Sequence, residues 1–273
     1  MNKYYKLILS AVISFAGFYF AFHGENIEEL VHHLRQLHWL PFWISVFLLL
    51  FSCLVRALRW QYILAPVEQI PLHPLFGSVM VGYFGNNILP FRLGELLRAY
   101  SVSSRFTISV PQAFGTVILE RILDLAAVVF IFLTMIPWYP FQNTGLKFGI
   151  IIFTGITISL IVLILIMYHF RLLNRIKPWS VFHTRIGAVL FHLVENIFDG
   201  LTLLSKTRHT AGLIFTSTIL WMIYYIVTYL LLISCSIDIG FIGTCILLII
   251  GSLVIGIPAL PGSAGTYDAG IKY

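Results

Sequence analysis

The hydrophobic positions of the chain gather into long runs, separated by shorter polar or amphipathic segments. An α-helix rises about 1.5 Å per residue, so about 20 apolar residues cross a hydrocarbon core of about 30 Å. Runs of this length predict membrane-spanning helices at about 4–22, 40–63, 111–136, 146–168 and 210–233. We therefore expect an all-α, polytopic helical bundle that is integral to a membrane.

Two other apolar segments, at about 75–90 and 241–257, are interrupted by glycine and proline and lack the pattern of simple spans. At membrane depth, a broken helix must bury its free backbone groups in protein or in a wet cavity. Pairs of broken helices are typical of substrate sites in transporters. We predict two re-entrant elements, with breaks at Gly82, Pro90 and Gly94 in the first and at Pro261, Gly262 and Gly265 in the second.

The distribution of lysine and arginine sets the expected orientation, because cytoplasmic loops carry an excess of these residues. Lys3 and Lys6 place the N-terminus in the cytoplasm, and the basic segment 171–185 belongs on the same side. Both conditions hold only if segment 75–90 returns to the face from which it entered. By the same reasoning, the final apolar run enters from the external face.

Short sequence matches connect the two broken elements. GSVMVG at 77–82 matches GSLVIG at 251–256, and LPFRLG at 89–94 matches LPGSAG at 260–265. Related broken segments that enter from opposite faces indicate an inverted repeat with a substrate site near the midplane. The alternative is chance similarity between segments rich in glycine, proline and leucine.

The composition agrees with a membrane protein and argues against nucleic-acid binding and a metal site. Of the 273 residues, 59% are hydrophobic and 10% are charged, whereas a soluble domain has about 25% charged residues. The net charge of +6 is not gathered on a soluble domain, so it indicates topology rather than nucleic-acid binding. Cys53, Cys235 and Cys245 lack metal-ligand spacing, and no nucleotide-binding or catalytic motif is present. We expect no metal and no cofactor, and the sequence favours a flippase or transporter over an enzyme. Transport would be passive or driven by an ion gradient.

Polar residues follow the first broken element, in the stretch NNILPFRLGELLRAY. Asn86 and Asn87 could satisfy backbone groups freed at the break or hydrogen-bond a ligand headgroup. Glu95 and Arg98 are three positions apart and are expected to pair with each other. Arg92 has no comparable acid nearby, so it is the better candidate to meet an anion, although it could also simply set topology.

The span at 111–136 contains charged residues within its apolar sequence, in ILERILDL. Charges at the centre of a membrane helix cost about 2.5–3.5 kcal/mol each, so Glu120, Arg121 and Asp124 must face protein or water. They could form an ion-pair network that locks this span to the first broken element, through Arg92 or Arg98. Alternatively, they could be a cation or proton site or line a headgroup pathway. Arg56 and Arg59, in contrast, are expected to extend from the end of their span to lipid phosphates.

Four motifs resemble the flippase-like transmembrane family, which includes the membrane domain of lysylphosphatidylglycerol synthase. They are GYFxNNxLPxRxGExxR at 82–98, ERxxD at 120–124, LPGSxG at 260–265 and RALRW at 56–60. The resemblance covers essentially the whole chain and implies one transmembrane domain over residues 1–273, with two re-entrant elements, that moves lipids between leaflets. It also implies further spans beyond Tyr273, so we expect a truncated C-terminus. The soluble aminoacyl-transferase domain of some members is absent. The resemblance places the family's polar signature on Asn86, Asn87, Arg92, Glu95, Arg98, Glu120, Arg121 and Asp124.

The sequence thus predicts a protein of the cytoplasmic (inner) membrane that translocates an anionic phospholipid or a polyprenol-linked glycolipid. Arg92 and Arg98 would hold the phosphate, and Glu120 and Asp124 would line the path. One alternative is a secondary transporter of a small solute. A second is a membrane-embedded transferase with Glu120 as its base, and a third is a non-catalytic partner in envelope assembly.

Overall fold

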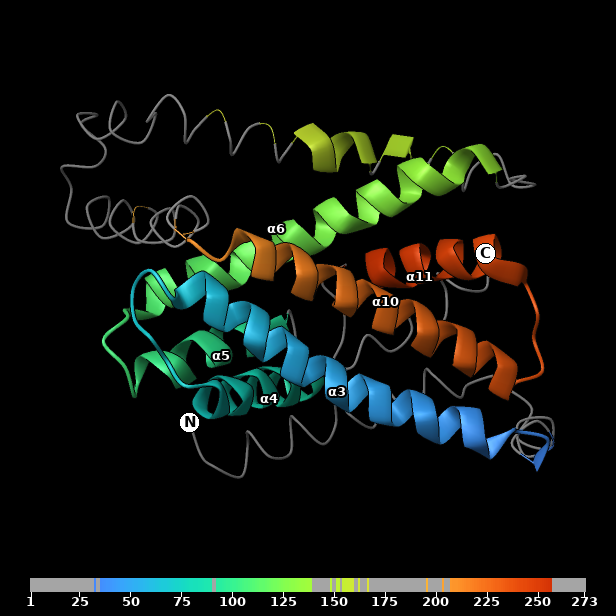
Figure 1. The fold of residues 1–273 in the computed structure, drawn as a ribbon, viewed down its shortest axis with the longest axis horizontal. Helices are drawn as coiled ribbons and strands as arrows, with labels where there is room; N and C mark the ends of the chain where they lie inside the picture. The colour runs from blue at the N-terminus through green and yellow to red at the C-terminus, as the bar shows by residue number, and fades with distance from the viewer. Residues whose placement is uncertain are drawn as a thin grey trace, which may run out of the picture.

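The computed structural model describes residues 35–89, 92–138 and 207–256, together with residue 32 and isolated positions within 148–203. Regular structure in these ranges is entirely helical, which confirms the expected all-α class (Figure 1). The predicted span at 4–22 lies outside the described residues, and the one at 146–168 lies largely outside them. Pro90, Pro261, Gly262 and Gly265 also lie outside them. The described helices are α3 (Trp39–Leu64), α4 (Leu72–Ile88), α5 (Gly94–Ser103), α6 (Val110–Met135), the short 3-10 helix η2 (Ile136–Trp138), α10 (Thr210–Ser234) and α11 (Gly240–Gly256).

Three predicted spans coincide with long helices to within two residues: α3, α6 and α10. Within the described part of the chain, α3 and α10 are long and apolar enough to cross a membrane. The outward face of α3 leaves large apolar side chains exposed, Trp43, Phe47 and Leu50 among them. Such a face suits contact with lipid, because it would be costly to hydrate.

Helix ends follow local sequence signals. Pro41 lies in the first turn of α3, where its missing N–H is not needed. Ser109 caps α6, and its hydroxyl accepts a hydrogen bond from the backbone N–H of Gln112 at 3.4 Å. Leu89, which precedes Pro90 in the sequence, has extended dihedral angles and ends α4. Proline disfavours the helical conformation of the residue before it, so α4 ends at the position where Pro90 predicts a break.

Helices α3 and α10 lie side by side and run in opposite directions (Figure 1). The backbone N–H of His38 donates to the carbonyl of Ser234 at 2.9 Å and joins the start of α3 to the end of α10. At the other end, the hydroxyl of Thr207 donates to the carbonyl of Tyr62 at 3.0 Å. These two hydrogen bonds, at opposite ends of the helix pair, hold the two apolar helices in register.

Helices α4 and α5 form a hairpin that begins and ends at the same end of the bundle, beside the second half of α3 (Figure 1). Its base is closed by Glu68, which accepts hydrogen bonds from the backbone N–H and the hydroxyl of Thr107 at 2.9 and 2.7 Å. The turn-back predicted for segment 75–90 is therefore present. That the hairpin lies within a membrane stays a prediction.

Glycines allow the two arms of the hairpin to touch. A side chain at Gly94 would collide with the carbonyl of Gly82 and with the amide of Asn86, and one at Gly85 would lie 2.7 Å from the Cα atom of Gly94. Small residues let helix backbones approach closely, as they do in packed membrane helices. Gly82 and Gly94, predicted as elements of the break, thus have their role in the contact between α4 and α5.

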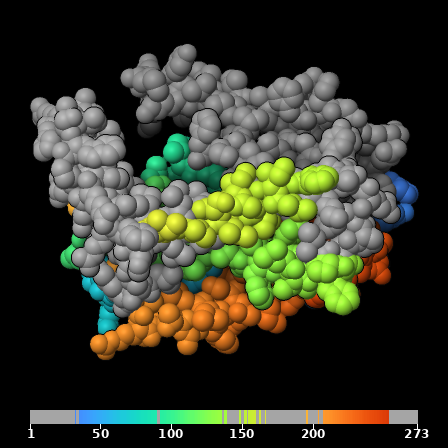
Figure 2. Space-filling view, turned by 90° about the horizontal axis from the view of Figure 1, so that it is seen from above, coloured from blue at the N-terminus to red at the C-terminus, as the bar shows by residue number. Residues whose placement is uncertain are grey.

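The remaining helices complete the bundle. Figure 2 shows the atoms of α6 and α10 on one face of the molecule, and α11 packs against both helices. Their shared core contains Phe132, Trp221 and Ile249. Helix α11 begins at the end of the bundle where α10 stops, opposite the base of the α4–α5 hairpin (Figure 1). Helices α4 and α11 thus begin at opposite ends of the bundle. The chain after Gly256 lies outside the described residues, so the inverted repeat stays a prediction.

Candidate functional site

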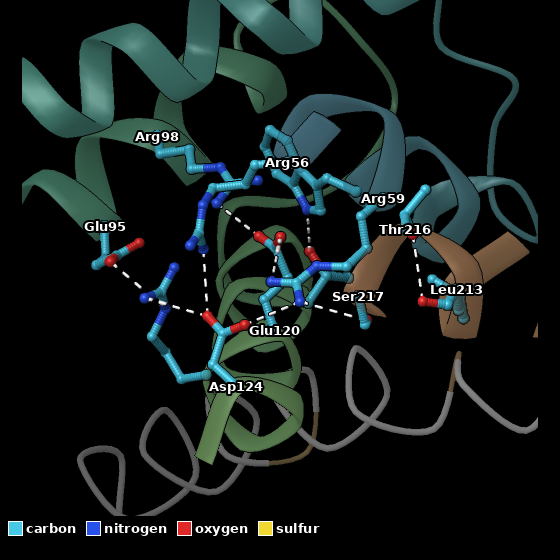
Figure 3. A network of polar contacts seen from close by, with 12 residues as sticks. Arg56, Arg59, Glu95, Arg98, Glu120, Asp124, Leu213, Thr216 and Ser217 are labelled. Carbon is cyan, nitrogen blue, oxygen red and sulfur yellow. Dashed lines mark hydrogen bonds and ion pairs between the residues drawn. The ribbon is translucent and has the colours of Figure 1, made fainter. Parts of the chain in front are cut away.

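Two arginines of α3 point into the bundle rather than toward its surface (Figure 3). The side chain of Arg59 is fully buried and that of Arg56 is 6% exposed. The expectation that both extend to lipid phosphates is therefore wrong. Their helix packs against α6 and α10, and both guanidinium groups pair with carboxylates of α6.

Glu120 is the carboxylate that pairs with the most deeply buried arginines. Its side chain is fully buried, and its two oxygens contact Arg59 Nη2 at 3.3 Å and Arg98 Nη1 at 2.5 Å. Trp60 stacks on Arg98, with the guanidinium carbon 3.9 Å from the ring centre, and its indole N–H donates to Thr116 at 2.8 Å. This inner layer, Arg59, Arg98 and Glu120, joins α3, α5 and α6.

Asp124, one turn further along α6, forms ion pairs with three arginines. Its oxygens lie 2.8 Å from Arg59 Nη1, 3.3 Å from Arg56 Nη1 and 3.4 Å from Arg121 Nη1. Arg56 also donates to the hydroxyl of Tyr224 at 2.7 Å, which brings α10 into the network. Arg121 and Asp124 are three positions apart on α6 and therefore pair within the same helix.

Glu95 connects the two most exposed arginines of the site. Its Oε1 atom lies 3.7 Å from Arg92 Nη2 and 3.7 Å from Arg121 Nε. Arg92 and Arg121 are 31% and 32% exposed, whereas Glu95 is 16% exposed. We call Arg92, Glu95 and Arg121 the outer layer. Arg98, expected to pair with Glu95, pairs with Glu120 instead.

Arg92 also departs from expectation in two ways. It has an acidic neighbour in Glu95, so the expectation that it lacks a local acid is wrong. Its backbone φ is +56°, in the left-handed region that side chains other than glycine rarely adopt. Backbone strain of this kind costs about 1–3 kcal/mol and is concentrated at functional sites, which makes Arg92 a candidate functional residue.

The charges of the site do not balance. Among the described residues, the network contains five arginines and three carboxylates. Two positive charges are therefore in excess, within a bundle of apolar helices. Buried Nε atoms of Arg56, Arg59 and Arg98 also have no hydrogen-bond acceptor in the described structure. Such an arrangement favours an anion, above all a phosphate, which guanidinium groups bind with two parallel hydrogen bonds.

The two asparagines of the hairpin differ in their surroundings. Asn86 lies against Gly94, and its side-chain oxygen is buried without a hydrogen-bond donor in the described structure. Asn87 is exposed. The break includes residues 90 and 91, which lie outside the described residues. For both asparagines, the role toward the freed backbone and the role toward a ligand therefore stay predictions.

No group of histidine, cysteine and carboxylate side chains suited to a metal ion occurs among the described residues. A groove of about 730 Å³ lies at the opposite end of the bundle, between Trp39 and Tyr229. None of the five arginines lines it. The arginine cluster, rather than this groove, is therefore the candidate site.

A bundle of apolar helices closed around a buried arginine–carboxylate cluster defines an α-helical integral membrane protein. The family model described as the lysylphosphatidylglycerol synthase TM region matches residues 7–271, and the chain belongs to this family. The resemblance seen in the four motifs is thereby confirmed. No solved structure matches the chain significantly.

Curated relatives are mainly archaeal membrane proteins. The chain is 35% identical to UPF0104 membrane protein MJ1595 of Methanocaldococcus jannaschii, over 34% of this chain and 28% of the relative. It is 23% identical to UPF0104 membrane protein PH1989 of Pyrococcus horikoshii, over 97% of this chain and 84% of the relative. A shorter similarity, 35% identity over 20% of this chain and 9% of the relative, is to a protein named Glycosyltransferase AglD of Haloferax volcanii.

Proposed function

We propose that the protein translocates an amphipathic, anionic lipid between the leaflets of the cytoplasmic membrane. The observation that carries this proposal is the excess of two positive charges, counted over the described residues, in a cluster whose outer layer is open to the surroundings. A headgroup phosphate would supply the missing negative charge while the acyl chains stay in lipid beside the apolar faces of the bundle.

The two layers of the cluster suit different tasks. The inner layer is closed, because Glu120 and Arg59 are fully buried and Arg98 is 3% exposed. It can hold α3, α5 and α6 together but offers little room to a ligand. The outer layer and Asp124 remain partly open, so the headgroup would travel past Arg92 and Arg121.

Membership of the family supports a role with lipids or lipid-linked substrates in general terms. The short similarity to a protein named as a glycosyltransferase makes a lipid-linked glycan the second candidate substrate, beside an anionic phospholipid. Both carry a phosphate next to a hydrophobic tail, so the same guanidinium groups could bind either. Since the sequence has no nucleotide-binding motif, the movement would be passive or coupled to an ion gradient.

Translocation can be measured as leaflet accessibility of labelled anionic and zwitterionic lipids in proteoliposomes. We expect the native protein to accelerate the equilibration of the anionic lipid, and Arg92→Ala and Arg121→Ala to lose most of this acceleration. Arg105→Ala is the matched control, because Arg105 is exposed after α5 and lies outside the ion-pair network. No acceleration by folded native protein, or an equal loss in the Arg105 variant, would refute the proposal.

A further inference from the structure

Glu95 is held more weakly than the other two carboxylates of the site. A single oxygen, Oε1, serves both Arg92 and Arg121, and each contact is 3.7 Å long. Glu120 and Asp124, by contrast, use both of their oxygens, and their shortest contacts with arginine are 2.5 and 2.8 Å. An ion pair at 3.7 Å exceeds the usual length of a charge-assisted hydrogen bond, about 2.7–2.9 Å. Glu95 is therefore the carboxylate that an incoming anion could replace most easily.

The partners of Glu95 are also the accessible ones. Arg92 and Arg121 are each about one third exposed, whereas Arg56, Arg59 and Arg98 are almost completely buried. An anion that approaches the cluster therefore meets the two arginines on which Glu95 lies. The carboxylate occupies the place that a phosphate would take.

The position of Glu95 in the chain strengthens this arrangement. It lies in the first turn of α5, and the residue that caps this helix, Leu93, makes no side-chain capping hydrogen bond. The free N–H groups and dipole of a helix N-terminus favour a negative charge there, whether it comes from a side chain or from a ligand. The N-terminus of α5 and the two arginines therefore both attract a negatively charged group to this position.

We propose that Glu95 is an internal competitor, which occupies Arg92 and Arg121 in the empty protein and is displaced by the phosphate of an anionic ligand. The identification of that phosphate as a lipid headgroup rests on the proposed function. The competition lowers affinity for the phosphate, and the returning carboxylate helps the headgroup to leave. Glu95 is in this sense a positioning residue that sets how tightly the site binds.

The direction of the effect makes the inference testable. A carboxylate that contributes to binding, or that only stabilises the fold, should weaken binding when it is neutralised. A competitor should do the opposite. We expect Glu95→Gln to bind an anionic phosphate about tenfold more tightly than the native protein, which corresponds to about 1.4 kcal/mol.

The experiment is a calorimetric titration of the purified full chain in detergent with a short-chain phosphatidic acid, repeated with inorganic phosphate. Glu68→Gln is the matched control, because it removes a carboxylate charge at the base of the same hairpin but outside the cluster. In an Arg92→Ala background, Glu95→Gln should give a smaller gain in affinity, since one of the two arginines for which the carboxylate competes is missing. Should Glu95→Gln fail to fold, Glu95→Asp, which withdraws the carboxylate by one methylene, is expected to tighten binding in the same direction.

The outcomes separate this inference from the proposed function. Tighter binding of phosphatidic acid in the Glu95 variant, absent from the Glu68 variant, supports both. Tighter binding of inorganic phosphate without any binding of the lipid supports the competitor but overturns lipid translocation in favour of a solute transporter. Unchanged or weaker binding in a variant that melts like the native protein overturns the competitor, even where translocation by the native protein is observed.

Discussion

Neutralising Glu120 gives the most direct test of what holds this bundle together. The carboxylate is fully buried between Arg59 and Arg98, at 3.3 and 2.5 Å. In Glu120→Gln, Arg59 retains Asp124 at 2.8 Å, whereas Arg98 loses its close carboxylate and keeps the face of Trp60. Removing one member of a buried ion pair costs about 3–5 kcal/mol, because the partner charge stays buried. Since an amide oxygen can still accept one hydrogen bond, we expect a loss of about 3 kcal/mol in the free energy of unfolding.

The free energy of unfolding can be followed by denaturant titration of the purified protein in micelles, with tryptophan fluorescence as the signal. Glu68→Gln serves as the control, because Glu68 is partly exposed in a loop and its carboxylate accepts hydrogen bonds from Thr107, outside the arginine cluster. Its loss should cost about 1 kcal/mol or less. If Glu120→Gln unfolds like the native protein but abolishes translocation, the structural role argued from its burial is wrong, and Glu120 acts on the ligand.

Three other substitutions test separate parts of the structure. Gly94→Ala should destabilise the protein by about 2 kcal/mol or more in the same titration, because its Cβ would collide with α4. The control is Gly77→Ala, which has open space around it and should be neutral or stabilising by up to about 1 kcal/mol. Arg92→Gly should be more stable than Arg92→Ala by about 1 kcal/mol, since both lack the charge but only glycine fits a φ of +56° without strain; equal stability would contradict this. Trp60→Phe should cost about 1–3 kcal/mol, because it leaves the buried hydroxyl of Thr116 without its indole donor, and a Trp60→Phe/Thr116→Val double variant should recover part of the loss.

The bounds of three long helices, α3, α6 and α10, could be predicted from the sequence almost to the residue. The runs that end near Leu64, Met135 and Ser234 are long and mainly apolar. In lipid, a helix satisfies the backbone hydrogen bonds of such a run within the segment itself. The turn at the tip of the α4–α5 hairpin was predictable for a local reason as well. Leu89 precedes a proline, and proline restricts its predecessor to extended conformations.

The partners within the site were less predictable, because they depend on how helices pack. Spacing along one helix suggested that Glu95 would pair with Arg98, but the contact between α5 and α6 turns Arg98 toward Glu120. Arg56 and Arg59 lie near the end of α3, where extension to headgroups is the usual outcome. The signal that could have placed them inside is electrostatic: two acids in the span at 111–136 need more positive charge than Arg121 alone provides.

The choice of arginine for every cation of the cluster bears on its function. A buried lysine can give up its proton and so remove an unbalanced charge, whereas arginine stays protonated in proteins. Among the described residues, the five guanidinium groups therefore keep an excess of two positive charges over the three carboxylates, and loss of a proton from an arginine cannot relieve it. Three of these groups are almost completely buried, so water can offset the excess chiefly at Arg92 and Arg121. An anion is thus attracted to the outer layer in particular, and the same geometry that makes the empty cluster costly in a membrane favours the passage of a phosphate there.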